Sequence, residues 1–162
     1  MEKKSEDLKI NCCSKFNSEP WDEKEIVWQE KLFIKDSIKS FFHIPLNIGK
    51  VITKNMKKIE EINALDSDFV MLFDEKSLWG ADVFFAVNKD VPESEITKMS
   101  GTFLTKVFEG SYKDMGKWIK EMEKYVELKG KKIEKMYFYY TTCPKCTKIY
   151  GKNYTVIFAK IY

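Results

Sequence analysis

The sequence has little histidine, glycine or proline and no long apolar run. Its 162 residues include one histidine, seven glycines and four prolines. Because His43 is the only histidine, a metal site of mixed histidine and carboxylate ligands is not expected. The sequence also has no G-x-S-x-G motif, which would carry the nucleophile of a Ser-His-Asp triad. No stretch approaches the length of a membrane-spanning helix, and MEKKSEDLKI lacks the apolar core of a signal peptide. We therefore expect a cytoplasmic protein without a membrane partner.

The sequence also lacks a strong excess of positive or negative charge. The chain holds 28 Lys and Arg against 25 Asp and Glu, interspersed along the sequence. Direct nucleic-acid binding is not expected, because it favours a concentrated basic stripe. Aromatic residues are abundant, with 12 Phe and 8 Tyr, and they are typical of strands and pocket walls. At this length a core forms without metal or disulfides, so no cofactor is required.

Two segments have the periodicity of amphipathic helices. Residues 47–62 form the first, with Asn47 expected to accept a hydrogen bond from the first turn as its N-cap. Residues 112–129 form the second, begun by Ser111 and ended by Gly130. The two segments therefore predict two helices, each with one apolar face.

The helices belong to a repeated pattern. At one offset, residues 48–52 align with 115–119, and FVMLF at 69–73 aligns with MYFYY at 136–140. Such self-similarity is typical of internal duplication. We predict an α+β fold made from a duplicated strand-helix-strand-strand unit, with an antiparallel sheet, both helices on one face and a ligand cleft between the halves.

The pattern also predicts the domain organisation. Residues 1–22 are expected to form an irregular arm and residues 23–162 a single domain, with pseudo-repeats at about 37–90 and 98–162. The first strand of each repeat is predicted at 37–44 and 102–109, and the run 25–36 extends or precedes the earlier one. The last strands of the repeats, 80–89 and 153–162, should close hairpins.

One motif carries a family resemblance. Phe108-Glu109-Gly110-Ser111-Tyr112 ends a strand and is followed by a helix with Trp118. Over residues 25–162 this arrangement resembles the GyrI-like (gyrase-inhibitor-like) small-molecule-binding family. The stretches SLWGADV and YYTTCPKC are similar to a stand-alone subgroup labelled as hydrolases.

The resemblance implies an aromatic-lined cleft that takes up small amphipathic or aromatic molecules. Members include effector domains of transcription activators, gyrase-inhibitory proteins and enzymes that hydrolyse reactive cyclopropane-containing compounds. No helix-turn-helix is present here, so the activator role does not carry over. Many members have Glu-x-Tyr on the strand after the second helix; here Tyr137 or Phe138 takes the glutamate position, which argues against a preference for cationic ligands.

Six aromatic residues are candidate ligand contacts. Strand alternation places Tyr137 and Tyr139 on the face away from the helices, where they could stack on a flat ligand. The alternative is that both are tyrosines at the edge of the core. The family motif adds Phe108, Tyr112 and Trp118, and Trp79 is expected at the rim of the cleft.

Three acidic residues are candidate catalytic groups. Asp74 and Glu75 lie close in sequence to Trp79 in a predicted loop, where a carboxyl beside an indole could act as general acid or base. Glu109 is the third. The alternative is that they are turn and strand-end residues in solvent. Hydrolysis requires at least one of these three groups or Asp82 to be buried toward the cleft.

The four cysteines leave three alternatives. Cys12, Cys13, Cys143 and Cys146 could hold a structural zinc, could be free loop thiols, or could be a redox pair at C-P-K-C. A redox role is the weakest, because a strand and not a helix follows Cys146. For the whole chain the first hypothesis is a hydrolase of reactive, largely apolar compounds. The alternatives are a non-catalytic protein that sequesters ligands or contacts gyrase, and a four-cysteine metal-binding module.

Overall fold

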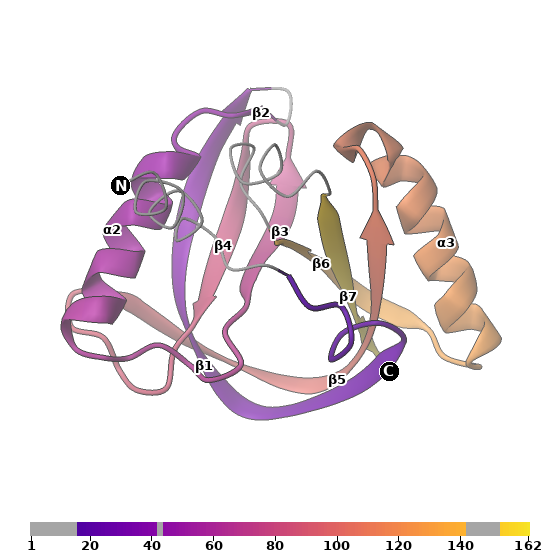
Figure 1. Cartoon of the computed structure of the whole chain (residues 1–162), viewed down its shortest axis with the longest axis horizontal. Helices are drawn as coiled ribbons and strands as arrows, with labels where there is room; N and C mark the ends of the chain where they lie inside the picture. The colour runs from indigo at the N-terminus through magenta and orange to yellow at the C-terminus, as the bar shows by residue number, and fades with distance from the viewer. Residues whose placement is uncertain (1–15, 42–43, 142–152) are drawn as a thin grey trace, which may run out of the picture. The chain divides into compact units, whose positions relative to one another are not determined.

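The computed structural model describes residues 16–41, 44–141 and 153–162. The chain divides into two compact units, which we describe separately. The α2 unit is Val27–Thr102, and the α3 unit combines Met1–Ile26 with Phe103–Tyr162. The long strands β1 (Lys24–Phe41) and β5 (Glu95–Glu109) contribute residues to both units (Figure 1).

The α2 unit is an antiparallel sheet with one helix. Its strands follow the order β2-β1-β4-β3, with β2 at Ile44–Pro45, β3 at Met71–Ser77 and β4 at Gly80–Ala86. Leu78 and Trp79 form the turn between β3 and β4, because Ser77 pairs with Gly80. The helix α2 spans Ile48–Glu61. It buries Val51, Asn55 and Ile59, one side chain per turn, as the sequence periodicity predicts.

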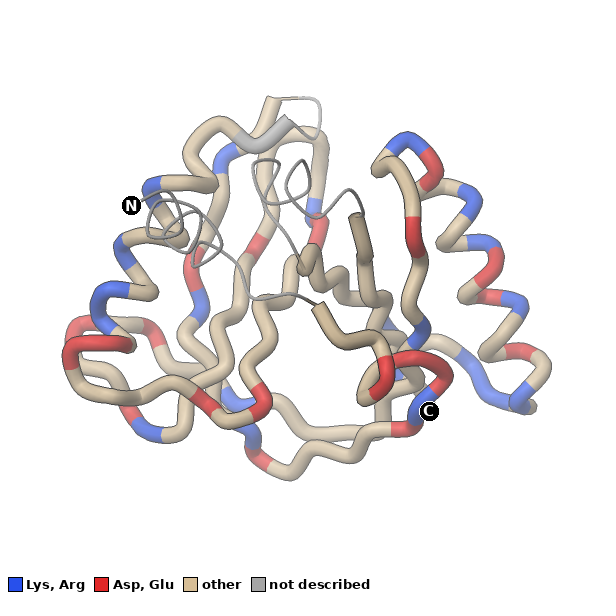
Figure 2. The backbone as a smooth tube through the Cα atoms, in the orientation of Figure 1, with Lys and Arg blue, Asp and Glu red and all other residues tan. Residues whose placement is uncertain are grey.

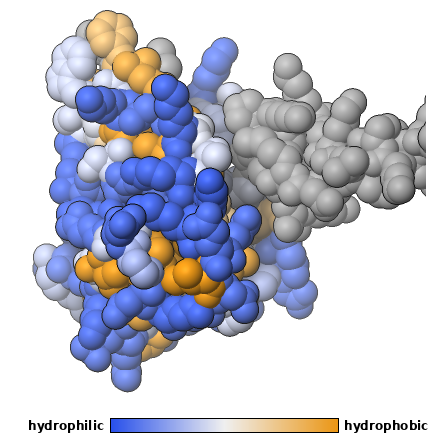
Figure 3. All heavy atoms as spheres, turned by 90° about the vertical axis from the view of Figure 1, so that its left-hand side faces the viewer, coloured by the Kyte–Doolittle hydropathy of each residue, from blue (hydrophilic) through white to orange (hydrophobic). Residues whose placement is uncertain are grey.

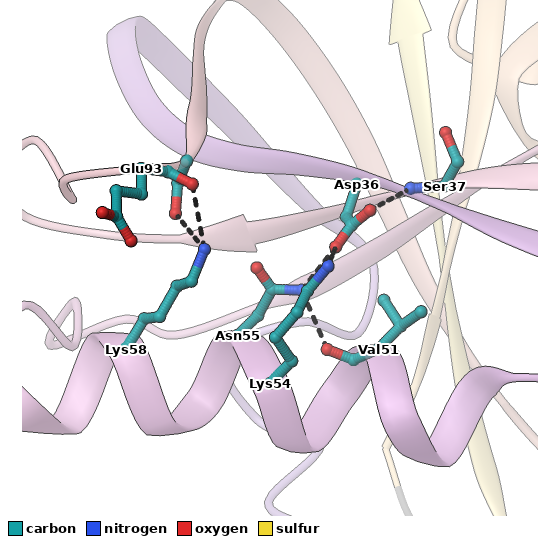
Figure 4. Close-up of polar contacts among 8 residues, drawn as sticks. Asp36, Ser37, Val51, Lys54, Asn55, Lys58 and Glu93 are labelled. Atoms are coloured by element: carbon teal, nitrogen blue, oxygen red, sulfur yellow. Dashed lines mark hydrogen bonds and ion pairs between the residues drawn. The ribbon is translucent and has the colours of Figure 1, made fainter.

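A polar network joins α2 to the sheet (Figure 4). The buried Asn55 amide donates to the Asp36 carboxylate at 2.9 Å and to the Val51 carbonyl at 2.8 Å. Lys54 forms an ion pair with Asp36 at 2.8 Å. Asp36 therefore lies on the sheet face that α2 covers. Both N–H groups of the Asn55 side-chain amide have an acceptor in the interior, as a buried amide requires.

This network makes stability dependent on pH. Burial by itself raises the pKa of Asp36, but hydrogen bonds from Lys54, Asn55 and the Ser37 N–H outweigh it and leave the pKa below 3.8. A depressed folded-state pKa adds stability above the unfolded value, and this contribution is lost as pH falls through the folded pKa. In urea titrations, Asp36→Asn should lower the unfolding free energy at neutral pH and flatten its decline below about pH 4. The exposed Asp90→Asn is the control, and an unchanged acid limb in Asp36→Asn would contradict the prediction.

The α3 unit has the order strand, helix, strand, strand along the chain. Its sheet order is β6-β7-β5, with β6 at Ile133–Tyr140 and β7 at Tyr154–Ile161. A short 3-10 turn, η1 (Tyr112–Asp114), leads into the helix α3 (Met115–Leu128). Trp118, Met122 and Val126 are buried under the helix, and Trp118 stacks on Phe108 of β5 at 5.8 Å.

Most expected elements are confirmed. An α+β fold with a mostly antiparallel sheet and two helices is observed, and Gly130 takes the expected left-handed conformation after α3 with φ of 71°. The Ser111 side chain caps the turn by accepting from the Lys113 N–H. The internal duplication and the cleft between the halves stay predictions.

Two local expectations were wrong. β5 begins at Glu95, earlier than the strand predicted at 102–109, because its first residues are largely polar and give no apolar strand pattern. β1 starts at Lys24, so the run 25–36 extends the first strand, one of the two alternatives that the sequence left open. Asn47 does not cap α2 with its side chain. Its Oδ1 instead accepts from the Lys39 N–H at 2.8 Å, tying the start of the helix to β1. Within the described residues, no helix is long and apolar enough to cross a membrane.

Candidate functional site

Two buried carboxylates face each other in the sheet of the α2 unit. Asp74 of β3 and Asp82 of β4 are directly opposed, with exposed fractions of 6% and 8%. Opposed residues in an antiparallel pair point to the same side, with Cβ atoms about 5 Å apart. Asp36 opposes Val83, the neighbour of Asp82, and contacts α2. Strand alternation therefore turns Asp74 and Asp82 to the sheet face opposite α2, here called the aspartate face.

Basic and hydroxyl groups surround Asp82. The Ser37 hydroxyl donates to its carboxylate at 3.4 Å, and the ammonium groups of Lys76 and Lys35 lie at 2.8 and 3.7 Å. Ser37 opposes Asp82 across β1 and β4, and Lys35 is two residues away on the same face. Two ammonium groups thus offset the negative charge that the paired carboxylates bring into the sheet.

The remainder of this stretch of the aspartate face is apolar. Leu72 of β3 opposes Phe84 of β4, and Phe33 of β1 packs edge-on against Phe84 at 6.3 Å between ring centroids. All three side chains are buried. Two opposed carboxyl groups at the border of an apolar surface are a candidate pair of general acid and general base.

The acidic residues predicted around the β3–β4 turn are not grouped in a loop. Asp74 and Glu75 are consecutive residues of β3, so they point to opposite faces, and Glu75 is exposed. Trp79 is in the turn itself, 57% exposed, with its ring 5.7 Å from that of Phe41. The expected loop of Asp74, Glu75 and Trp79 is wrong because β3 continues to Ser77. The catalytic role of Asp74 stays a prediction, now with Asp82 as its neighbour.

In the α3 unit, Tyr137 and Tyr139 share one side of β6. They oppose Phe158 and Val156 of β7. Trp21 lies against this side, with ring centroids 6.5 Å from Tyr139 and 5.5 Å from Phe158. Tyr137 is buried and Tyr139 half-buried. The structure thus brings both tyrosines together with Trp21, and their binding of a ligand stays a prediction.

The other candidates of the α3 unit are divided between core and surface. Phe108 and Trp118, with exposed fractions of 5% and 4%, stack on each other beneath α3. Tyr112 is exposed and contacts the edge of Tyr140 at 5.4 Å, on the other side of β6 from Tyr139. Glu109 is exposed at the end of β5. In this unit Phe108 and Trp118 contribute to core packing, and their predicted ligand contacts are untested.

Some residues of the aspartate face were not predicted as site residues. Lys35 and Ser37 flank Asp36 in β1, and a polar run of this kind is typical of a solvent-facing part of a strand. Asp82 is named from the sequence only as a further carboxylate to check for burial; as the one polar residue of the buried strand GADVFFA it is a stronger candidate than that. Polar residues inside otherwise apolar strands were therefore the informative feature.

The cysteine and histidine predictions lie outside the described residues. This applies to Cys12, Cys13, Cys143, Cys146 and His43. Among the residues that are described, no three His, Cys, Asp or Glu side chains are grouped so as to hold a metal ion. The four-cysteine zinc site therefore stays a prediction.

The fold is shared with solved structures at low sequence identity. It is similar to the C-terminal domain of EcmrR, at 13% identity and a TM-score of 0.64 over 88% of this chain and 98% of that one. A hydrolase from Listeria innocua is similar at 12% identity and a TM-score of 0.61 over 98% of both chains, and another Listeria innocua hydrolase at 11% and 0.60 over 88% and 93%. The family model described as bacterial hydrolase matches residues 3–161, so the chain belongs to that family. No curated protein matches it.

Proposed function

We propose that this protein hydrolyses a small, largely apolar compound at the aspartate face. The observation that carries the proposal is the opposed, buried pair of Asp74 and Asp82 next to Phe84 and Leu72. Carboxylates are seldom buried without a reason, since desolvation of each costs several kcal/mol, on the order of the stability of a domain. Membership of a family described as bacterial hydrolase, and the fold shared with two Listeria innocua hydrolases, support the same reaction class.

One of the two carboxyl groups would act as the general base and the other as the general acid. Asp82, whose charge is balanced by Lys76 and Lys35, accepts a proton from the attacking water. The water oxygen bonds to the electrophilic carbon of the substrate while the strained ring bond breaks. Asp74 delivers a proton to the departing atom, and the proton taken up by Asp82 then passes back to Asp74 across the strand pair. Hydroxide and proton add across the broken bond, so the reaction needs no cofactor, and the Ser37 hydroxyl holds Asp82 in place.

The substrate class is proposed to be uncharged and aromatic or strained in structure. The aspartates are bordered by the buried side chains of Phe33, Leu72 and Phe84, and the lysines of this face do not favour a cation. A strained three-membered ring is a fitting electrophile, since ring opening needs only an acid and a base. This matches the substrates that the family resemblance implies.

A screen tests the proposal. The protein is incubated with uncharged aromatic compounds, some with a strained ring and some with the ring already opened, and followed by mass spectrometry. We expect strained compounds alone to gain the mass of one water. Ligands that bind without chemical change would replace this function by the second candidate, a sequestering protein.

That second candidate has its own observation. In the α3 unit the half-buried Tyr139 and Trp21 lie on the same side of the sheet as the buried Tyr137 and Phe158, an aromatic cluster that could bind flat molecules without chemistry. It predicts that binding survives loss of both aspartates and is weakened by Tyr139→Ala. Contact with gyrase is the further alternative, for which a pull-down with purified gyrase is the test.

A further inference from the structure

Large apolar side chains gather at one end of the α2 unit. There β1 ends, α2 begins and β3 turns into β4. Backbone bonds join these segments, from the Ser40 N–H to the Trp79 carbonyl at 2.8 Å and from the Leu46 N–H to the Lys39 carbonyl at 2.9 Å. The side chains that define this apolar tip, with their exposed fractions, are Phe41 (52%), Leu46 (68%), Leu78 (41%) and Trp79 (57%).

The apolar tip differs from the other exposed apolar residues. Val27 and Leu128 are exposed singly, whereas the rings of Phe41 and Trp79 are 5.7 Å apart and Leu78 is next in sequence to Trp79. Figure 3 shows hydrophobic side chains at the upper end of the face that carries α2. Contiguous exposed apolar groups of this kind mark interaction sites.

Basic residues begin directly beside the tip. After Leu46, α2 carries Lys50, Lys54, Lys57 and Lys58 and no acidic residue before Glu60. Figure 2 shows this run as blue segments along α2, while α3 alternates blue and red. Lysines in the first turns and glutamates in the last are the reverse of what the helix dipole stabilises. Lys54 pairs with Asp36 and Lys58 donates to the Glu93 carbonyl, so these two lysines hold α2 in place, whereas Lys50 and Lys57 are exposed.

We propose that the apolar tip docks on the surface of an anionic lipid bilayer. Trp79 and Phe41 suit the headgroup level, where aromatic rings are enriched, and Leu46 and Leu78 reach the acyl boundary. Exposed Lys39 and Lys50 would lie near anionic headgroups. An apolar insertion combined with basic residues is the two-part signal that peripheral membrane binding requires.

This proposal is independent of turnover. The sequence predicts no membrane partner because no segment can span a bilayer, but surface docking needs no spanning segment. A surface that concentrates apolar compounds would also place the protein near the kind of substrate proposed above.

Co-sedimentation of the full chain with vesicles tests it. Vesicles of phosphatidylcholine are compared with vesicles that also contain phosphatidylglycerol, at low and high salt. We expect binding to the anionic vesicles only, weakened by salt. The tip variant Leu46→Ser with Leu78→Ser should bind at least about tenfold more weakly than the wild type. Its control, Val27→Ser with Leu128→Ser, should bind like the wild type.

A second pair of variants isolates the charge. Lys39→Gln with Lys50→Gln should weaken binding by about fivefold per lysine, while Lys117→Gln with Lys120→Gln on α3 should not. Circular dichroism establishes that each variant is folded. Equal binding to neutral vesicles, absence of binding by the wild type, or equal losses in test and control variants would overturn the proposal. A wild-type dimer in sedimentation velocity, together with a monomeric tip variant, would also overturn the proposal, because a second copy of the chain would then cover the tip.

Discussion

Asp74→Asn and Asp82→Asn should each lower kcat/KM by roughly a hundredfold or more on any compound that the wild type hydrolyses. The amide keeps the shape of the side chain but neither accepts nor donates the proton, and loss of a general acid or base typically costs about 10²–10⁴ in rate. Combining the two changes should cost much less than the product of the single losses if the groups act as a unit. Stopped-flow or discontinuous mass-spectrometric kinetics on the best substrate of the screen measures both.

Glu75→Gln is the matched control for these variants. Glu75 follows Asp74 in β3 but points to the other face and is exposed. We expect Glu75→Gln to retain wild-type kinetics, and we expect the same of the exposed Glu109→Gln. If Glu75→Gln or Glu109→Gln abolished turnover while both aspartate variants retained it, the catalytic centre would be the one first expected from the sequence and not the aspartate face.

Trp118→Ala should have the largest effect on stability. Trp118 is 4% exposed and stacks on Phe108, so its truncation leaves a cavity beneath α3. Replacing a buried aromatic residue with alanine costs about 3–5 kcal/mol of unfolding free energy. Urea unfolding monitored by circular dichroism gives the change in midpoint and in free energy.

Leu128→Ala on the same helix provides the comparison. Leu128 is 77% exposed, so its truncation should change the unfolding free energy by about 0.5 kcal/mol or less. The opposite pattern is also informative. A Trp118→Ala variant of wild-type stability that no longer binds ligand would show that Trp118 is the ligand contact predicted from the family motif, and not a core residue.

The helices could be predicted from the sequence because their signals are local. Apolar spacing in α2 and α3, the Ser111 cap and the glycine at position 130 each act within one or two turns. The start of β5 could not, since a strand with a polar side is stabilised by its neighbours and not by its own composition. The same holds for Asn47, whose partner Lys39 lies in another element.

The candidate site was only half predictable for the same reason. Asp74 was selected for its closeness in sequence to Trp79, but its neighbour in the structure is Asp82, brought opposite by the register of β3 and β4. Register depends on which side of each strand is buried. Lys35 and Ser37 join through the pairing of β1 with β4. The cross-strand neighbours of a residue can therefore be identified only once the strand register is known. A polar residue within a buried strand, in contrast, is visible in the sequence.

The most direct test of the central claim is carboxyl-carbon NMR of the aspartates with and without a bound, slowly reacting compound from the screen. Asp74 and Asp82 on the aspartate face are compared with Asp36, which lies on the opposite face of the same sheet against α2. The proposal predicts that the carboxyl resonances of Asp74 and Asp82 shift on binding while that of Asp36 does not. A bound ligand that shifts Asp36, or none of the three, would contradict it.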